Sequence, residues 1–211
     1  MSTSVEPGLR ERKRIATRRT IQRSVLLLAV EHGFDRVTVE DISRESQISP
    51  RTFFNYFSSK DEALVGDIPE LPDEPIVEQF VTAGPDGDIL DQLGELFAAS
   101  ATSAAEDREM HTLRRQVFQR HPHLFGLKMQ TMRAFEATLY ELVVRRLLRD
   151  DPSLETDEAA LYERAWLITL VAFAGLRHGW RCWAEMDNPG SLSERLRASF
   201  RQLHTIASET R

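Results

Sequence analysis

The chain has 211 residues, of which 41% are hydrophobic and 28% charged, enough apolar material for a packed core, which excludes a disordered chain. Residues 1–60 hold 11 Lys and Arg against 7 Asp and Glu, a net charge of +4, whereas the remaining residues hold 16 against 26, a net charge of −10. The overall charge of −6 is therefore the sum of a basic N-terminal part and an acidic remainder. This distribution suits a protein that offers one face to phosphate.

Cysteine content and hydropathy favour a cytoplasmic protein. Cys182 is the only cysteine, and the chain does not open with a charged segment followed by an apolar one. The longest apolar run, Ala165 to Leu176, includes Thr169 and is too short to span a bilayer. We therefore expect a reducing compartment and no membrane partner.

The first predicted helix runs from about Leu9 to His32, after an irregular start over residues 1–8. Lysines and arginines crowd its first half, including Arg14 and Arg18. A solvated basic helix end would explain them. Beside a DNA-binding motif, however, an arm that contacts phosphates, with arginines in a minor groove, explains them better.

Three helix-start signals follow within 23 residues. Two N-caps have a carboxylate three residues on, and a third is followed by proline, whose missing N–H costs nothing at the first helical position. The caps are Thr38, Ser59 and Ser49, respectively. The expected helices span about Val39 to Glu45 and Pro50 to Phe57, with a further helix after Ser59 that ends near Asp67. The first two form a helix-turn-helix.

The second helix of this pair carries the chemistry. Phe53 and Phe57 can face a core, which leaves arginine, asparagine, hydroxyl and aromatic groups over the remaining surface. DNA recognition in the major groove uses this mixture, because arginine reads guanine, asparagine reads adenine and an apolar ring contacts a thymine methyl group. A small helical subdomain with incidental aromatic residues is the alternative.

The segment from Phe34 to Leu64 resembles the DNA-binding domain of the TetR/AcrR family of bacterial transcriptional regulators. The residues in register are Thr38, Ile42, Ile48, Ser49, Thr52, Phe53, Phe57, Lys60 and Leu64. Two positions depart from the family pattern. Gln47 stands where a turn glycine is usual and must accept a strained or altered turn, and Phe54 replaces a tyrosine. The candidate DNA contacts are Arg14, Arg18, Thr38, Ser49, Pro50, Arg51, Thr52, Phe54, Asn55, Tyr56 and Lys60.

The rest of the chain is expected to be helical. Three prolines at three-residue intervals predict a linker over residues 68–87, between a DNA-binding domain at 1–67 and a helical domain at 88–211. The pattern after the linker predicts helices at about Asp88 to Ala105, Arg108 to Arg120, Leu124 to Leu148, Glu158 to Ala184 and Leu192 to Ala207. The predicted fold is all-α, with an N-terminal three-helix helix-turn-helix domain and a C-terminal helical domain.

The resemblance implies that the last two helices pair with their copies in a homodimer. The helix from Glu158 carries a stripe of small residues and the helix from Leu192 carries an apolar stripe, and these stripes would allow the paired helices to approach closely. The candidate interface residues are Ile168, Ala172, Gly175, Gly179, Leu196, Phe200 and Leu203.

The resemblance also implies a pocket for a hydrophobic small molecule in the C-terminal domain. Its candidate lining is Phe97, Met110, Leu113, Phe118, Phe125, Met129, Met132, Trp166, Phe173 and Arg177, although ordinary core explains each apolar residue alone. Arg177, on an aromatic helix face, needs a partner, either a protein carboxylate or an anionic ligand. His121 and His123 lack a third ligand at a recognisable spacing, so no metal is expected.

Three classes of function remain. A ligand-responsive repressor, released from a near-palindromic operator by its effector, explains the most residues, and an activator of the same fold is not separated from it. A helical adaptor that has lost DNA recognition is the second class. The third, a helical enzyme, is disfavoured because no catalytic motif is present, and no cofactor is expected.

Overall fold

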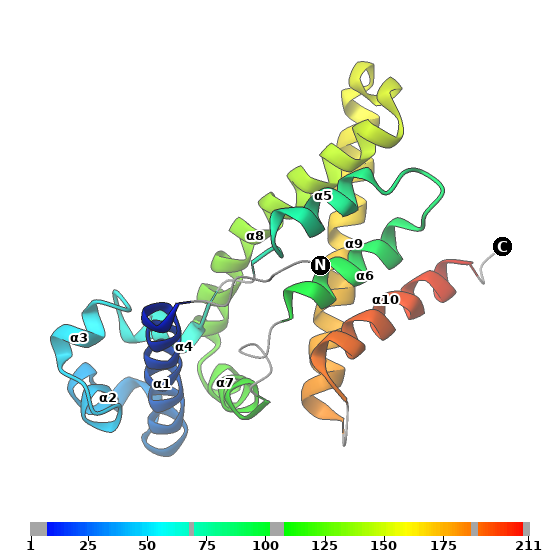
Figure 1. Ribbon diagram of the computed structural model, residues 1–211. Coiled ribbons are helices and arrows are strands. Elements are labelled where there is room, and N and C mark those ends of the chain that lie inside the picture. Colours follow the sequence, from blue (N-terminus) through cyan, green and yellow to red (C-terminus); the bar gives the residue numbers. More distant parts are fainter. Residues whose placement is uncertain (1–7, 68–69, 102–107, 187–189, 209–211) are drawn as a thin grey trace. The chain divides into compact units, whose positions relative to one another are not determined.

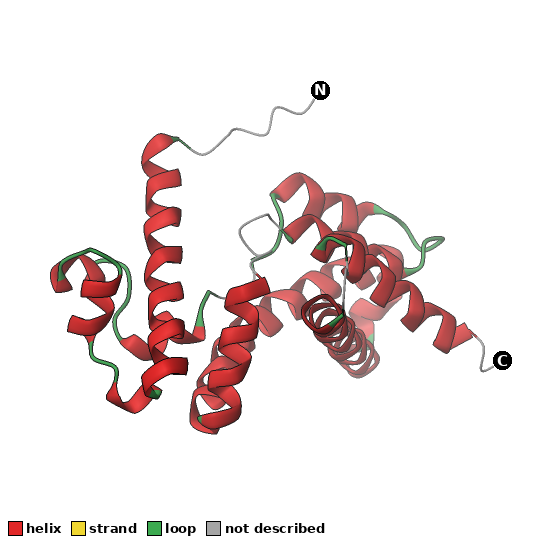
Figure 2. Cartoon of the chain, turned by 90° about the horizontal axis from the view of Figure 1, so that it is seen from below, coloured by secondary structure: helices red, strands yellow, loops and turns green. Residues whose placement is uncertain are grey.

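The computed structural model describes residues 8–67, 70–101, 108–186 and 190–208. Its helices are α1 (Leu9–His32), α2 (Val39–Glu45), α3 (Pro50–Phe54), α4 (Lys60–Val65), α5 (Glu74–Thr82), α6 (Ile89–Ser100), α7 (Arg108–Arg120), α8 (Pro122–Asp150), α9 (Glu158–Glu185) and α10 (Leu192–Ser208), with 3-10 turns at Phe34–Arg36 and Pro152–Thr156 (Figure 1). Only helices and loops occur in the described residues (Figure 2). The expected all-α fold is confirmed. The expected irregular start lies, except for Gly8, outside the described residues.

The end of one helix and the nature of the linker differ from the expectation. The second helix of the motif ends at Phe54, not Phe57. Beyond Phe54 the chain forms turns, in which the backbone N–H groups of Tyr56 and Phe57 both bond to the carbonyl of Phe53. The expected linker contains a helix, α5, whose apolar side chains Val77, Phe80 and Val81 are buried in a core. Proline at the second position of α5 starts the helix rather than breaking it.

The turn between α2 and α3 explains how Gln47 replaces glycine. The N–H of Ile48 bonds to the carbonyl of Ser43, and the N–H of Gln47 bonds to that of Arg44. This pair of bonds is a Schellman ending, which requires a left-handed residue at the position of Gln47. Gln47 has φ +55°, the only positive φ of a non-glycine residue in the described parts of the chain. The expected strained turn is confirmed.

The chain divides into two compact units. We call residues 1–67 and 109–129 the head unit, and residues 68–108 and 130–211 the body unit. The sequence assigned α7 and all of α8 to the C-terminal domain. Instead, α7 and the first residues of α8 belong with the helix-turn-helix, because Met110, Val117 and Leu124 are buried in the same core as Ile21 and Phe53.

In the body unit, α6, α9 and α10 pack side by side (Figure 1), and the small residues of α9 make this possible. A Cβ atom on Gly175 would lie 2.8 Å from Cζ of Phe200, and one on Gly179 would lie 2.8 Å from Cδ2 of Leu196. Ala172 is fully buried as well. The stripe of small residues on α9 therefore packs against α10 of the same chain.

This packing corrects the predicted dimer interface. Ala172, Gly175, Gly179, Leu196 and Phe200 are buried within the chain, and Ile168 and Leu203 pack against the same core. The close approach of another helix to α9 was predicted correctly, but that helix is α10 of the same chain and not a helix of a second copy. Among the large apolar side chains that α9 exposes, Leu167 and Leu170 lie on its opposite face.

Among the described helices, α9 alone is long and apolar enough to cross a membrane by length and composition. That finding differs from the expectation based on the uninterrupted apolar run. A helix whose apolar faces pack against protein passes the same test, and one face of α9 packs on α6 and α10.

Among the described residues of the body unit, one arginine is buried, and it is not Arg177. Arg146 on α8 is 1% exposed, and its Nε donates to Oδ2 of Asp150 at 2.5 Å. Its Nη atoms donate to the carbonyl oxygens of Phe80 and Gly84 and to Oε1 of Gln92. Arg146 thus joins α8 to the end of α5 and the start of α6. In contrast, Arg177 is exposed, so it needs no partner within the chain.

Candidate nucleic-acid interface

The helix α3 presents an exposed face of mixed chemistry. Phe53 is fully buried, whereas its neighbour Phe54 is 57% exposed and packs edge-on against it, with ring centroids 5.4 Å apart. Arg51 and Asn55 are exposed on the same short helix and its end, and their side chains have no hydrogen-bond or ion-pair partner among the described residues. An arginine, an amide and an apolar ring are thus free to meet base edges.

The helix starts beside this face are tightly capped. Ser49 accepts a hydrogen bond from the N–H of Thr52 at 3.0 Å, and Pro50 takes the first helical position. Thr38 and Asp41 form a capping box at the start of α2. Hydrogen bonds from Thr38, and then from Arg44, lower the pKa of Asp41 to about 2. These caps fix the two helices of the motif relative to their turn.

The predicted arm residues behave differently from one another. Arg14 is exposed and pairs with Glu11 one turn away, through an Nη2–Oε1 distance of 2.7 Å. An exposed pair of this kind is weak, so Arg14 can turn to a phosphate. Arg18 contradicts the expectation of a free arm residue, because its guanidinium is held by the carboxylate of Asp67 and the carbonyl of Tyr56.

Lys60, a predicted DNA contact, is engaged within the head unit. Its Nζ donates to the carbonyl oxygens of Phe34 and Val37, both at 2.9 Å, and lies 4.4 Å from the centroid of the Phe34 ring. Lys60 therefore closes the 3-10 turn between α1 and α2. Sequence spacing gave no signal for this role, since the partners are 26 and 23 residues away.

The predicted pocket residues do not come together. Met110, Leu113 and Phe118 pack in the head core, and Phe125 and Met129 are exposed there. Phe97, Met132 and Phe173 pack in the body core, and Trp166 stacks on Tyr140 at 4.9 Å. The predicted grouping was wrong, because the residues expected to line one pocket are divided between the head core and the body core.

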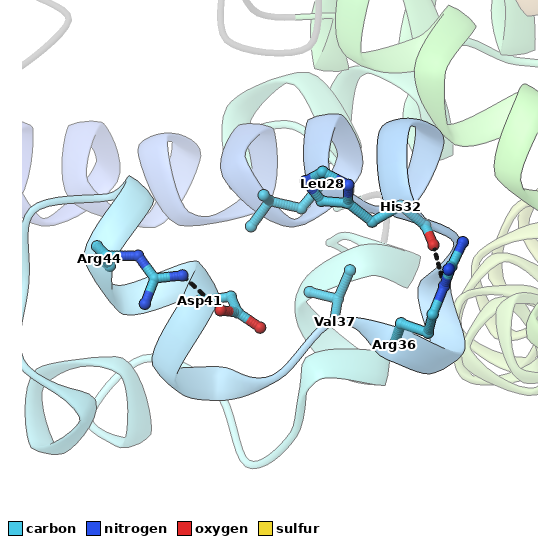
Figure 3. Close-up of a pocket in the computed structure, with 6 residues that line it drawn as sticks. All are labelled: Leu28, His32, Arg36, Val37, Asp41 and Arg44. Atoms are coloured by element: carbon cyan, nitrogen blue, oxygen red, sulfur yellow. Dashed lines mark hydrogen bonds and ion pairs between the residues drawn. The ribbon is translucent and has the colours of Figure 1, made fainter.

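A shallow hollow of about 340 Å³ lies between α1 and α2 in the head unit (Figure 3). Leu28 and Val37 form its apolar part, and His32, Arg36, Asp41 and Arg44 surround them. Arg36 and Arg44 are engaged by the His32 carbonyl and by Asp41. None of the predicted pocket residues lines it.

The described residues contain one group with metal-ligand chemistry, formed by Asp88, Asp91 and His204, all of them exposed. Asp88 already has other roles there. Its Oδ1 caps α6 by accepting from the N–H of Leu90 and Asp91, and its Oδ2 pairs with Nδ1 of His204 at 2.6 Å. This arrangement is a helix cap with an ion pair, and it does not involve His121 or His123.

Residues 26–65 match the family model described as bacterial regulatory proteins, tetR family. This match places a TetR-family domain in residues 26–65 of the chain. The matched residues run from the last part of α1 to the end of α4, so the head unit carries the DNA-binding domain of this family.

Two curated TetR-type regulators are similar to this chain. The transcriptional regulator TcmR of Streptomyces glaucescens is 39% identical over 82 residues, which cover 39% of this chain and only about a third, 34%, of TcmR. The putative mycofactocin biosynthesis transcriptional regulator MftR of Mycobacterium tuberculosis is 27% identical over 191 residues, which cover 90% of each chain.

Solved structures with a similar arrangement include Thermus thermophilus FadR, a TetR family transcriptional repressor in complex with lauroyl-CoA. It has 18% identity and a TM-score of 0.43, over 89% of this chain and 93% of FadR. Salmonella enterica GusR has 20% identity and a TM-score of 0.40, over 89% of this chain and 95% of GusR.

Proposed function

We propose that this TetR-family chain is a ligand-responsive transcriptional regulator that binds a near-palindromic operator as a homodimer and represses until an apolar effector releases it. The observation that carries the proposal is the exposed face of α3, where Arg51, Phe54 and Asn55 are available to read bases. Thr38, Ser49, Thr52, Arg14 and Tyr56 are the proposed contacts to the phosphate backbone around it.

The base-reading role predicts a specific loss for Arg51→Ala. We expect it to cost about 1–3 kcal/mol on the selected operator and to relax the preference at one base pair, because a bidentate arginine–guanine contact is lost. Arg14→Ala is the matched control, since removing a phosphate contact weakens all sequences alike. Binding to a duplex selected from a random library and to a scrambled duplex measures both. Equal losses on the two duplexes for Arg51→Ala would remove Arg51 from the base-reading set.

The dimer part of the proposal uses the face of α9 that the chain leaves open. Leu167 and Leu170 are 64% and 54% exposed, and helical spacing places Glu163, Ala174 and Arg177 on the same stripe. Large exposed apolar stripes of this kind mark protein contacts. The stripe belongs to the body unit, whereas α3 belongs to the head unit.

The order of residues on the stripe is self-complementary. If two copies of α9 cross antiparallel at Leu170, Glu163 is seven residues before the crossing and Arg177 is seven after it. Each arginine then meets Glu163 of the partner subunit, as a two-fold interface requires. Within the described residues, neither side chain has a hydrogen-bond or ion-pair partner. A dimer of this kind would supply the partner that Arg177 lacks, and its heads would address half-sites about 34 Å apart or a multiple of that distance.

The effector part of the proposal rests on the aromatic core of the body unit. Phe135 contacts both Phe97 and Phe173, with centroid distances of 6.2 and 5.8 Å, and the flexible side chain of Met132 lies at the edge of this cluster. An apolar compound that enters here would displace these side chains. Because Arg177 is exposed and does not line this core, it gives no support to an anionic group on the effector.

An effector of this class should raise the melting temperature and release DNA, because a ligand favours the conformation that it binds better. The measurement is a thermal-shift screen of apolar drugs, acyl compounds and hydrophobic amines, followed by DNA binding for each hit. A Met132→Trp variant, which fills the edge of the cluster, should lose the response. If no compound stabilises the protein, the body unit is a filled core and the effector part is wrong.

A further inference from the structure

Arg18 of α1 lies where several parts of the head unit meet. Its Nη1 donates to the carbonyl oxygen of Tyr56 at 2.6 Å, just beyond the end of α3. Its Nε donates to Oδ1 of Asp67 at 2.7 Å, and Nη2 lies 2.6 Å from the same oxygen. The guanidinium carbon lies 4.1 Å from the centroid of the Phe57 ring. With its side chain 25% exposed, Arg18 is held by two chain segments that follow α3 and α4.

Asp67 is the second centre of this cluster. Its Oδ2 accepts from Nε2 of Gln22, a residue of α1 that is 4% exposed, at 3.1 Å. Its backbone carbonyl accepts from Nζ of Lys128 on α8 at 2.9 Å. Nearby, Nε of Arg114 on α7 donates to the carbonyl of Leu64 in the last turn of α4, at 2.7 Å. Asp67, just after α4, is thus held by α1 through its carboxylate and by α8 through its carbonyl, and the last turn of α4 is held by α7.

Lys128 is half-buried, and its bond to the Asp67 carbonyl lies at the surface of the head unit. Burial, and then the charge of Arg114, lower the pKa of Lys128 to about 8, while Asp67 opposes the shift. With a pKa of about 8, Lys128 stays mostly charged at neutral pH and can hold the Asp67 carbonyl.

We propose that Arg18 is a positioning residue for DNA reading. Through the Tyr56 carbonyl and the Phe57 ring it sets the end of α3 against α1, and through Asp67 it ties that position to α4 and to the parts of α7 and α8 in the head unit. This inference rests on the proposed function, because positioning matters only if α3 reads DNA. It replaces the expectation that Arg18 neutralises a phosphate.

The two roles respond differently to substitution. A phosphate contact depends on charge, so Arg18→Lys should keep most of it. A positioning role depends on the planar fork that bonds Asp67 and Tyr56 together, which lysine lacks. A substitution of Asp67 distinguishes the two roles further. A carboxylate repels phosphate, so Asp67→Asn should strengthen general DNA binding unless Asp67 acts through the position of α3.

The test uses the full-length protein and a duplex that the wild type selects from a random library, with a scrambled duplex of equal length. We expect Arg18→Lys to weaken binding to the selected duplex roughly tenfold, or about 1.4 kcal/mol, and Asp67→Asn roughly threefold. Binding to the scrambled duplex and the salt dependence should stay at the wild-type value. The double variant should lose no more than Arg18→Lys, because both act on one contact. Arg14→Ala is the control, with equal losses on both duplexes and a salt slope lower by about 1.

Several results would overturn the inference. Arg18→Lys that binds the selected duplex as the wild type does, or Asp67→Asn that binds both duplexes more tightly, would show that α3 does not depend on the bridge. If Arg18→Lys is unfolded at the assay temperature, Asp67→Asn decides alone, since it leaves the bond from Arg18 to Tyr56 in place. A wild-type protein that enriches no sequence would instead contradict the proposed function, and the inference with it.

Discussion

Leu170→Glu is expected to dissociate the dimer that we propose. Leu170 lies at the centre of the exposed stripe on α9, so an antiparallel crossing there would bring two glutamates together in an apolar contact. An unpaired buried charge costs about 3–5 kcal/mol, which corresponds to more than a roughly 100-fold rise in the dimer dissociation constant. Sedimentation velocity at micromolar concentration measures the change. Operator binding should fall with it, since one monomer addresses one half-site.

Ile76→Glu is the matched control for this experiment. Ile76 is also an exposed aliphatic residue, 36% exposed, but it lies on α5. The control variant should sediment as the wild type does. A charge exchange adds a second test, because Arg177→Glu should weaken the dimer and Glu163→Arg in the same chain should restore it. If Leu170→Glu remains a dimer, or if the exchange restores nothing, the interface lies elsewhere.

Arg146→Met should be the most damaging single change in the body unit. The substitution removes the donor to the Asp150 carboxylate and to the carbonyl oxygens of Phe80 and Gly84. The Asp150 side chain is 15% exposed and its Oδ1 already lacks a partner in the described structure. Breaking a buried pair on one side costs about 3–5 kcal/mol, because the remaining charge is uncompensated.

The neighbouring residue gives a close control. Arg145 pairs with Glu78, but its side chain is 50% exposed, so Arg145→Met should change the free energy of unfolding by no more than about 0.5–1 kcal/mol. Urea denaturation of the three proteins measures the difference. Similar midpoints for Arg146→Met and the wild type would mean that the buried arginine is replaceable by an apolar side chain of similar length, as some buried ion pairs are.

Local signals predicted the helices because caps and helical spacing act over a few residues. Thr38, Ser49 and Ser59 are N-caps in the structure, as expected, and α1, α2 and α7 have the expected bounds. Gln47 was identified through the family resemblance, which has glycine at this turn, and its φ of +55° agrees because a Schellman ending needs a left-handed residue there. The exposed and buried faces of α3 also followed from spacing.

Partners distant in sequence were not predicted, because spacing along the chain does not show which surface a side chain will meet. The small stripe of Gly175 and Gly179 signalled a close helix approach, but α10 of the same chain takes it. Similarly, the basic residues Arg18 and Lys60 read as phosphate contacts, yet carbonyl groups and Asp67 hold them.

The sequence by itself determined the all-α fold, the helix-turn-helix and the exposed chemistry of Arg51, Phe54 and Asn55, since these depend on backbone preferences and on the periodicity of one helix. Tertiary structure alone decided which arginine is buried, which face of α9 stays open and which unit receives α7. Those outcomes depend on the competition between surfaces for burial, and a surface takes the partner that covers it best, wherever that partner lies in the sequence.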